Sequence, residues 1–233
     1  MTDSRSRTAA RSSDPVPAVR LGRAFFDRPT RRVARELLGA RLRVAKEGEV
    51  REVRIVETEA YVRHDEASHT YRGRTARNRS MFGPPGTLYM FRIHQVACAN
   101  LVTRRGEAVL LRAGAPTPPT EGVASGPGRL CRVVGLTIAD DGTDAVTGHR
   151  VEVLPRSTRP RRVGVGPRVG ISRAVERPLR FWIVGDPAVS KAPASTASAS
   201  PSRSRGVGRY PRSRTRSRPS SGGGRSVDRT DGR

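Results

Sequence analysis

The chain has 233 residues, a formal net charge of +24 and a hydrophobic fraction of 35%, which is low for a chain folded from end to end. We therefore expect one globular domain with tails. No window supplies the roughly 20 apolar residues of a membrane span, and the N-terminus lacks the hydrophobic segment of a signal peptide. These features predict a cytoplasmic protein with no membrane partner, associated with the nucleoid if the source is bacterial.

The N-terminal part of the chain predicts a disordered arm followed by a helix. Residues 1–17 are polar and rich in Ser, Arg and Ala, which is typical of disorder. The helix is expected to have Thr30 as its N-cap, because apolar residues then repeat at helical spacing up to Leu38. Gly39 is expected to end it.

The central part of the chain predicts short strands and one further helix. Ser125–Leu136 has a cap and a proline before apolar residues on one face, which predicts the helix. The predicted strands are Arg41–Ala45, Glu49–Glu59, Leu88–Phe91, Ala108–Ala113, Val151–Leu154, Arg168–Ile171 and Arg180–Val184. Strands outnumber helices and the connections are too short for repeated βαβ crossovers. We therefore predict an α+β fold, a single mixed domain over residues 18–190 with a curved, mostly antiparallel sheet and flanking helices.

Residues 191–233 form an Arg/Ser-rich tail that is predicted to be disordered. This tail has eleven basic residues and two acids, or +9, which leaves +15 for residues 1–190. A domain this basic predicts a polyanionic partner, because neutralising phosphates releases their counterions. A solvated basic surface is the alternative.

The two cysteines, Cys98 and Cys131, form no CxxC pair, so neither a disulfide framework nor a zinc ribbon is expected. They are expected to be buried thiols in a reducing compartment. His64 and His69 share no helical face and have no cysteine cluster beside them. We therefore expect no metal and no cofactor.

The segment Ile55–Phe91 concentrates the residue types that bind and process a nucleic-acid base. It holds five of the ten aromatic residues of the chain, together with Glu57, Glu59 and a run of arginines. The two acids lie two apart in a predicted strand, so their side chains face the same side. Either could be a general base on water, and either could instead be the ion-pair partner that a buried Arg112 requires.

The loop Arg72–Arg79 (RGRTARNR) predicts a phosphate-binding patch, in which Arg72, Arg74, Arg77 and Arg79 are expected to contact a phosphate backbone. The rings of Tyr89 and Phe91 could face a base or belong to the core. His69 is expected in a pocket wall, as a hydrogen-bonding residue.

Long motifs occur in order between Val19 and Ser190, and together they resemble the 3-methyladenine DNA glycosylase family of the alkyladenine type. They are VETEAY at 56–61, ASHTYRGRTARNRSMFGPPGTLYMF at 67–91, CANLV at 98–102, VLLRA at 109–113, ASGPGRLC at 124–131 and RVGISRAVERPLRFWIVGDPAVS at 168–190. The resemblance implies a monofunctional, monomeric glycosylase that flips alkylated purines out of double-stranded DNA and hydrolyses their glycosidic bond without a metal or a covalent intermediate.

The resemblance also assigns roles to single residues. Glu59 matches the general base that activates water, and Arg112 matches the arginine that helps to hold that water. The base-pocket residues are matched by Tyr61, His69, Phe91 and Asn100, the last of which screens against normal guanine. Phe82 and Tyr89 are then assigned to the scaffold.

The chain departs from the family at Arg92–Ala97 (RIHQVA), where the family has a Tyr-Gly-Met run whose tip tyrosine wedges into the DNA. The segment is one residue short, so Ile93 or His94 would be the intercalating residue, and we expect weaker base extrusion. Two rivals follow: a catalytically weakened or non-catalytic DNA- or RNA-binding protein on the same scaffold, and a hydrolase of free nucleosides.

Overall fold

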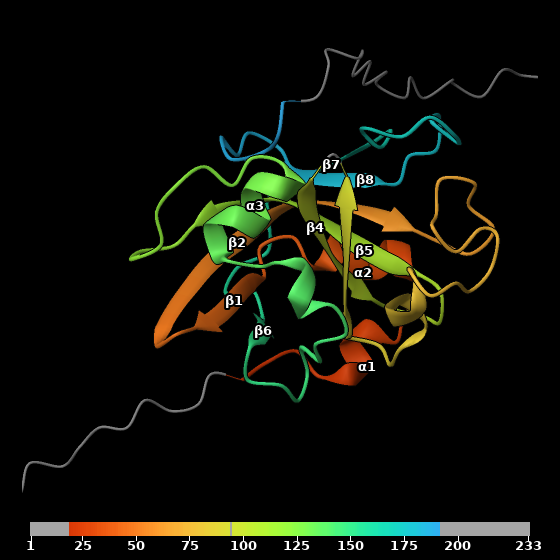
Figure 1. Ribbon diagram of the computed structural model, residues 1–233. Helices are drawn as coiled ribbons and strands as arrows, with labels where there is room; N and C mark the ends of the chain where they lie inside the picture. Colours follow the sequence, from red (N-terminus) through yellow and green to blue (C-terminus); the bar gives the residue numbers. More distant parts are fainter. Residues whose placement is uncertain (1–18, 94, 192–233) are drawn as a thin grey trace, which may run out of the picture. The chain divides into compact units, whose positions relative to one another are not determined.

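The computed structural model describes residues 19–93 and 95–191 (Figure 1). The predicted arm, His94 and the predicted tail beyond Lys191 lie outside the described residues. Within the described part, short helices precede and separate three groups of consecutive strands. The α-helices are α1 (Arg23–Phe26), α2 (Thr30–Glu36) and α3 (Pro127–Val134), and the 3-10 helices are η1 (Arg79–Phe82) and η2 (Ile138–Asp140). None of the described helices could cross a membrane, because each is too short and too polar.

The described strands form one curled sheet in which every pairing is antiparallel, so the predicted α+β fold is confirmed. The strands are β1 (Arg41–Lys46), β2 (Glu49–Tyr61), β3 (Leu88–Ile93), β4 (Val96–Val102), β5 (Ala108–Pro116), β6 (Val151–Leu154), β7 (Val163–Gly166) and β8 (Arg180–Ile183). Their order is β3-β4-β5-β2-β1-β6, and β8 pairs with both β2 and β7.

The long strand β2 organises the site because different stretches of it have different partners. Its first half pairs with β1 and its Glu57–Glu59 stretch pairs with β8, while β5 runs along its other edge. The hydroxyl of Thr58 donates to the carbonyl of Ala34 in α2 at 2.8 Å. Because side chains alternate along a strand, Glu57 and Glu59 point to the opposite face from α2.

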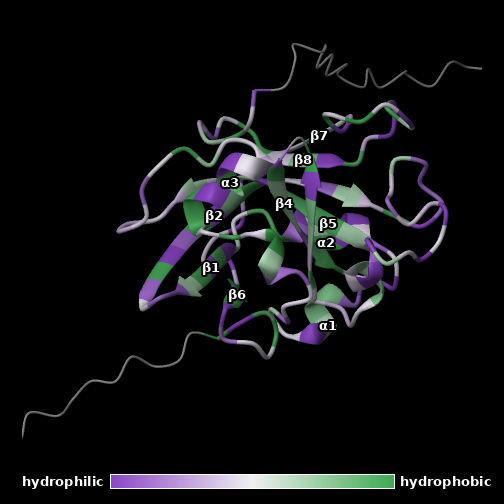
Figure 2. Ribbon diagram, in the orientation of Figure 1, coloured by the Kyte–Doolittle hydropathy of each residue, from purple (hydrophilic) through white to green (hydrophobic). Residues whose placement is uncertain are grey.

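The apolar core lies between the sheet and the helices packed on it, and the strands in the middle of Figure 2 are correspondingly hydrophobic while most loops are polar. The largest fully buried side chains include Phe26, Leu42, Leu101, Leu111 and Leu130. They come from α1, α3 and three different strands. A single core therefore supports the strands that carry the candidate site.

Several predicted boundaries are confirmed, and two details are wrong. Thr30 is not the cap of α2, since Pro29 is at that position and the Thr30 hydroxyl bonds to that of Thr103 at 2.7 Å and also contacts Glu107. The predicted strand Arg168–Ile171 is also wrong: the strand is β7, a few residues earlier. The backbone after β7 leaves the sheet because its polar groups bind side chains of the site.

Candidate active site

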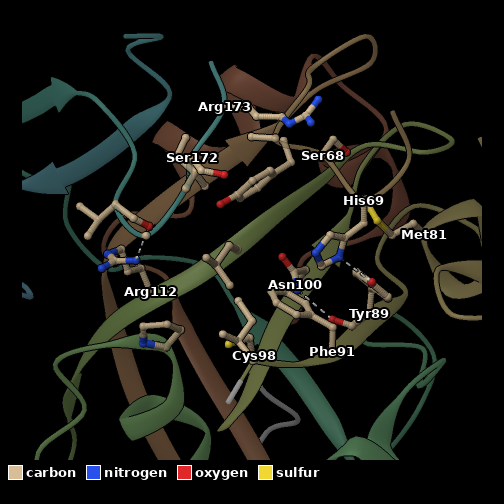
Figure 3. A pocket seen from close by; sticks show the side chains of 18 of the residues that line it. Ser68, His69, Met81, Tyr89, Phe91, Cys98, Asn100, Arg112, Ser172 and Arg173 are labelled. Atoms are coloured by element: carbon tan, nitrogen blue, oxygen red, sulfur yellow. Dashed lines mark hydrogen bonds between the residues drawn. The ribbon is translucent and has the colours of Figure 1, made fainter. Parts of the chain in front are cut away.

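A cavity of about 630 Å³ lies among β2, β3, β4, β5 and the segment 169–173 (Figure 3). Several of its lining side chains are planar rings or carry polar groups: Tyr61, His69, Tyr89, Phe91, Asn100 and Arg112. These residues come from elements far apart in the sequence. They combine flat rings with groups that form hydrogen bonds, which suits a planar ligand that also makes hydrogen bonds.

Three aromatic residues form one wall of the cavity, and they fix one another's orientation. The ring of His69 meets Phe91 edge to face at 4.6 Å, and Phe91 stacks with Tyr89 at 5.8 Å. The hydroxyl of Tyr89 lies 2.8 Å from Nδ1 of His69, as drawn in Figure 3. Partial burial lowers the pKa of His69, so its imidazole is neutral near pH 7 and presents a ring face without repelling a cation.

Tyr61 contributes a further aromatic wall and is held from behind. The guanidinium of Arg168 lies 4.7 Å from the centre of its ring. Arg168 is itself paired with Asp65, and both side chains are fully buried. Burial raises the pKa of Tyr61, with the nearby charge of Glu59 adding to the effect, so the hydroxyl stays protonated and can donate to a carboxylate.

Glu59 is the carboxylate that touches the cavity wall. Its Oε1 accepts from the amide of Val169 at 2.8 Å and lies 3.4 Å from Nη1 of Arg112, and its Oε2 accepts from the Tyr61 hydroxyl at 3.0 Å. The side chain is fully buried, and this burial raises its pKa against the opposing attraction of Arg112. All three of its partners line the cavity. The carboxylate is therefore one residue layer behind the cavity surface.

A local irregularity in the sheet brings Arg112 to this carboxylate. The register between β2 and β5 shifts on both sides of Glu57, which leaves Arg112 as an unpaired extra residue between Leu111 and Ala113. Bulges of this kind redirect a side chain. Arg112 contacts both acids of β2, whereas the sequence predicted one or the other as its partner. Its Nη1 also donates to the carbonyl of Val169 at 3.4 Å.

The other acid of β2, Glu57, lies on the same face of the strand as Glu59 but does not line the cavity. It is bound by Nε of Arg180 at 2.6 Å, by Nε of Arg112 at 3.0 Å and by the amide of Ser190 at 2.8 Å. Neither Arg180 nor Ser190 borders the cavity. The geometry thus separates the two acids that the sequence left equivalent.

The remaining predicted site residues divide into two groups. Asn100 is buried in the cavity wall, where its amide donates to the carbonyl of Tyr89 at 3.1 Å. The four arginines predicted to bind phosphates lie outside the cavity, all exposed, in the connection between β2 and β3 that includes η1. They are Arg72, Arg74, Arg77 and Arg79. Their position leaves them free to contact a long polyanion.

The predicted intercalating segment begins where β3 and β4 pair at the rim of the cavity. Ile93 pairs with Val96, and both line the cavity while remaining 44% and 38% exposed. His94 lies outside the described residues. Val96 packs on α3, where a Cβ at Gly128 would lie 1.7 Å from its Cγ1. Ile93 is therefore the less constrained of the two aliphatic side chains.

Three contributions to the cavity were not expected from the sequence. Tyr89, assigned to the scaffold, lines the cavity and bonds to His69. Met81 also lines it, from η1. The segment 169–173 was expected to be partly a strand, yet Val169 binds Glu59 and Arg112 through its backbone. The alternation of apolar and polar residues in a sequence does not indicate which backbone groups bind side chains of a site.

Metal chemistry needs a cluster of ligands. Among residues 19–93 and 95–191, no three His, Cys, Asp or Glu side chains converge on one point. Burial also raises the pKa of the cavity thiol, Cys98, to about 11, so this cysteine is a neutral group.

Comparison with known proteins shows the family of the chain. Residues 24–187 match the family described as Methylpurine-DNA glycosylase (MPG). A relative from Agrobacterium fabrum is 42% identical over 181 residues, covering 72% of this chain and 91% of its own. Relatives from Methanoculleus marisnigri and Rhodopseudomonas palustris (strain BisB5) are 41% and 40% identical, covering 72% and 80% of this chain and 97% and 98% of their own. All three carry the name "Putative 3-methyladenine DNA glycosylase".

Proposed function

The chain belongs to the methylpurine-DNA glycosylase family, and we propose that it is a DNA-repair hydrolase that releases alkylated purines, 3-methyladenine among them, from DNA. One observation carries this proposal: behind a cavity walled by aromatic rings lies a buried carboxylate, and the arginine and the backbone amide that bind it belong to residues of the cavity surface. The aromatic walls suit the base, and the carboxylate suits the attack on its sugar.

Base recognition rests on the aromatic walls. An alkylated purine carries positive charge, and electron-rich ring faces attract a cation. Tyr61, His69 and Phe91 would supply those faces, and the neutral state of His69 avoids charge repulsion. Asn100, fixed by its bond to the Tyr89 carbonyl, would stand against the edge of the purine and discriminate against the exocyclic amine of guanine.

The target base must leave the duplex, because its glycosidic bond is unreachable within the stack. Ile93, exposed at the rim of the cavity, would fill the space that the base vacates, as apolar wedges do in other DNA-bending proteins. The exposed arginines of the connection between β2 and β3 would bind the phosphates on either side. A single copy of the chain carries all of these groups, so we propose a monomer acting on double-stranded DNA.

For the chemical step, Glu59 would take a proton from water as the water oxygen forms a bond to C1′. The bond from C1′ to the purine nitrogen breaks, and its electron pair leaves with the base, which neutralises the positive charge of the alkylated ring. The Val169 carbonyl and the carboxylate of Glu59 both lie next to Nη1 of Arg112, so the carbonyl and Arg112 would orient the water beside Glu59. The negative charge of Glu59 also favours the positively charged sugar. The step is hydrolytic, with no covalent intermediate, metal or cofactor.

The proposal is tested by incubating the purified chain with duplexes that carry single defined lesions: 3-methyladenine, 7-methylguanine, hypoxanthine or ethenoadenine. We expect release of the free base from at least one of them. The short hairpin at Ile93 favours one other function, nucleic-acid binding without catalysis. Tight binding of lesion DNA with no base released from any duplex would support that function instead.

A further inference from the structure

Glu57 is fully buried, lies two residues before Glu59 and has no part in the cavity wall. It nevertheless sits at the centre of an ion-pair network. The side chains of Arg180 and Arg112 approach its Oε1 at 2.6 and 3.0 Å, and the amide of Ser190 donates to its Oε2 at 2.8 Å. Burying a carboxylate is costly unless it is paired, so this arrangement calls for an explanation.

The network reaches the proposed active site through Arg112. The Nε end of this guanidinium binds Glu57 and, at 3.2 Å, the hydroxyl of Ser190. Its Nη1 lies 3.4 Å from both Oε1 of Glu59 and the carbonyl of Val169. A guanidinium is planar and rigid. Holding the Nε end therefore fixes the direction in which Nη1 points.

We propose that Glu57 is a positioning residue that orients Arg112 and shares its positive charge, so that Glu59 keeps the basicity that the reaction needs. This inference rests on the proposed role of Glu59 as the base. It assigns a function to an acid that contacts neither the cavity nor a bound base.

The charges around Glu59 support this role. Two carboxylates, Glu57 and Glu59, are balanced by two guanidiniums, those of Arg112 and Arg180. Burial is the largest influence and raises the pKa of Glu59, Arg112 lowers it, and the charge of Glu57 raises it. The other groups that face this region are Tyr61 on β2, Cys98 on β4, Arg180 opposite Glu59 on β8, and Arg168 with the amide of Val169 in the loop after β7.

A change that removes the charge of Glu57 would leave Arg112 acting on Glu59 alone. The pKa of Glu59 would then fall, and Nη1 would lose its fixed direction. In the pH profile of single-turnover excision by Glu57→Gln, we therefore expect the acid limb, where the rate falls with falling pH, to move to lower pH. We also expect the plateau rate to fall about 10- to 100-fold, because Arg112 is misplaced. Arg180→Met removes a cation instead of an anion, so its acid limb should move to higher pH.

The matched control is Glu52→Gln. Glu52 is a buried acid of the same strand that also binds two arginines, Arg41 and Arg43, at 3.3 and 3.0 Å. Its loss should leave the pH profile of excision unchanged. An acid limb in Glu57→Gln that coincides with that of the wild type would overturn the proposal, and so would an equal displacement in the control.

If Glu57→Gln does not fold, Glu57→Asp retains the charge and shortens the side chain. It should keep the acid limb of the wild type and lower the plateau rate, whereas an unaltered plateau would overturn the positioning role. Failure of the proposed function is distinguishable, because the wild type would then release no base from any duplex. Failure of the proposed role of Glu59 would appear as full excision by Glu59→Gln. An inactive Glu59→Gln with an unaltered Glu57→Gln overturns only the role of Glu57.

Discussion

The backbone amide of Val169 lies 2.8 Å from Oε1 of Glu59, 110 positions earlier in the chain. The carbonyl of the same valine accepts from Arg112. Val169 thus holds Glu59 through its backbone amide and Arg112 through its backbone carbonyl. This arrangement explains why the segment after β7 leaves the sheet. Under the proposed function, it is also where a water molecule would be held.

The rate of excision should depend on pH through Glu59. Burial raises its pKa above the ordinary value for a glutamate, so the group takes up its proton at a higher pH than an exposed glutamate would. A general base must be deprotonated. The rate of excision should therefore be at its maximum above the raised pKa of Glu59 and should be lost as the pH falls through this pKa. Single-turnover rates across the acidic range would measure this, and a rate that is flat down to the ordinary glutamate range would contradict it.

Tyr61→Phe keeps the ring and removes the hydroxyl that donates to Glu59 at 3.0 Å. That bond lowers the pKa of Glu59, so its loss should move the acid limb of excision to higher pH. The free energy of unfolding should fall by about 1.5–3 kcal/mol, the usual range for a hydrogen bond to a charged group. Affinity for lesion DNA should hold in this variant but fall in Tyr61→Leu, which lacks the ring. Equal affinity loss in both variants would contradict the assigned roles.

Asp65→Ala should destabilise the fold strongly. Its partner Arg168 is fully buried, and removing the carboxylate leaves that guanidinium without its counter-charge. The expected loss in the free energy of unfolding is about 3–5 kcal/mol, measured by urea denaturation. Lys46→Ala is the control, because it removes one side of an exposed pair with Glu47 at 3.6 Å. A loss of about 0–1 kcal/mol is expected there, and a similarly small loss in Asp65→Ala would refute the account.

Ile93→Ala should weaken excision from duplex DNA and spare excision from single strands. The side chain is exposed at the rim of the cavity and would stabilise the unstacked duplex. Unstacking a base step costs a few kcal/mol, so a loss of about tenfold or more on duplexes is expected. Val123→Ala, at an exposed valine that does not line the cavity, is the control. Equal losses on both kinds of DNA would argue against the wedge.

The sequence was sufficient for the parts of the fold that local patterns encode. Alternation and turn residues predicted β1, β2, β5 and β6 to within a few residues, and Gly135, in the left-handed conformation at φ 74°, ends the predicted helix α3. The motifs gave the family and the residues to inspect. Several of those residues, from Tyr61 to Arg112, converge on one cavity.

The sequence was not sufficient where tertiary contacts override local preference. Thr30 has the chemistry of a cap but bonds to Thr103 instead, because α2 packs against the turn between β4 and β5. The pattern of Arg168–Ile171 predicts a strand, but a buried ion pair and the bonds of Val169 to Glu59 and Arg112 determine its path. The difference between Glu57 and Glu59 depends on a bulge and on β8, and neither is visible in the spacing of the two acids.

The central claim is that Glu59 is the base of a DNA glycosylase, and Glu59→Gln tests it most directly. Glutamine keeps the size of the side chain and removes its ability to accept a proton from water. Excision of 3-methyladenine from alkylated duplex DNA should fall at least 100-fold, since general-base catalysis contributes about 10²–10⁴-fold, while binding of the same duplex is retained. Excision at the rate of the wild type would contradict the account.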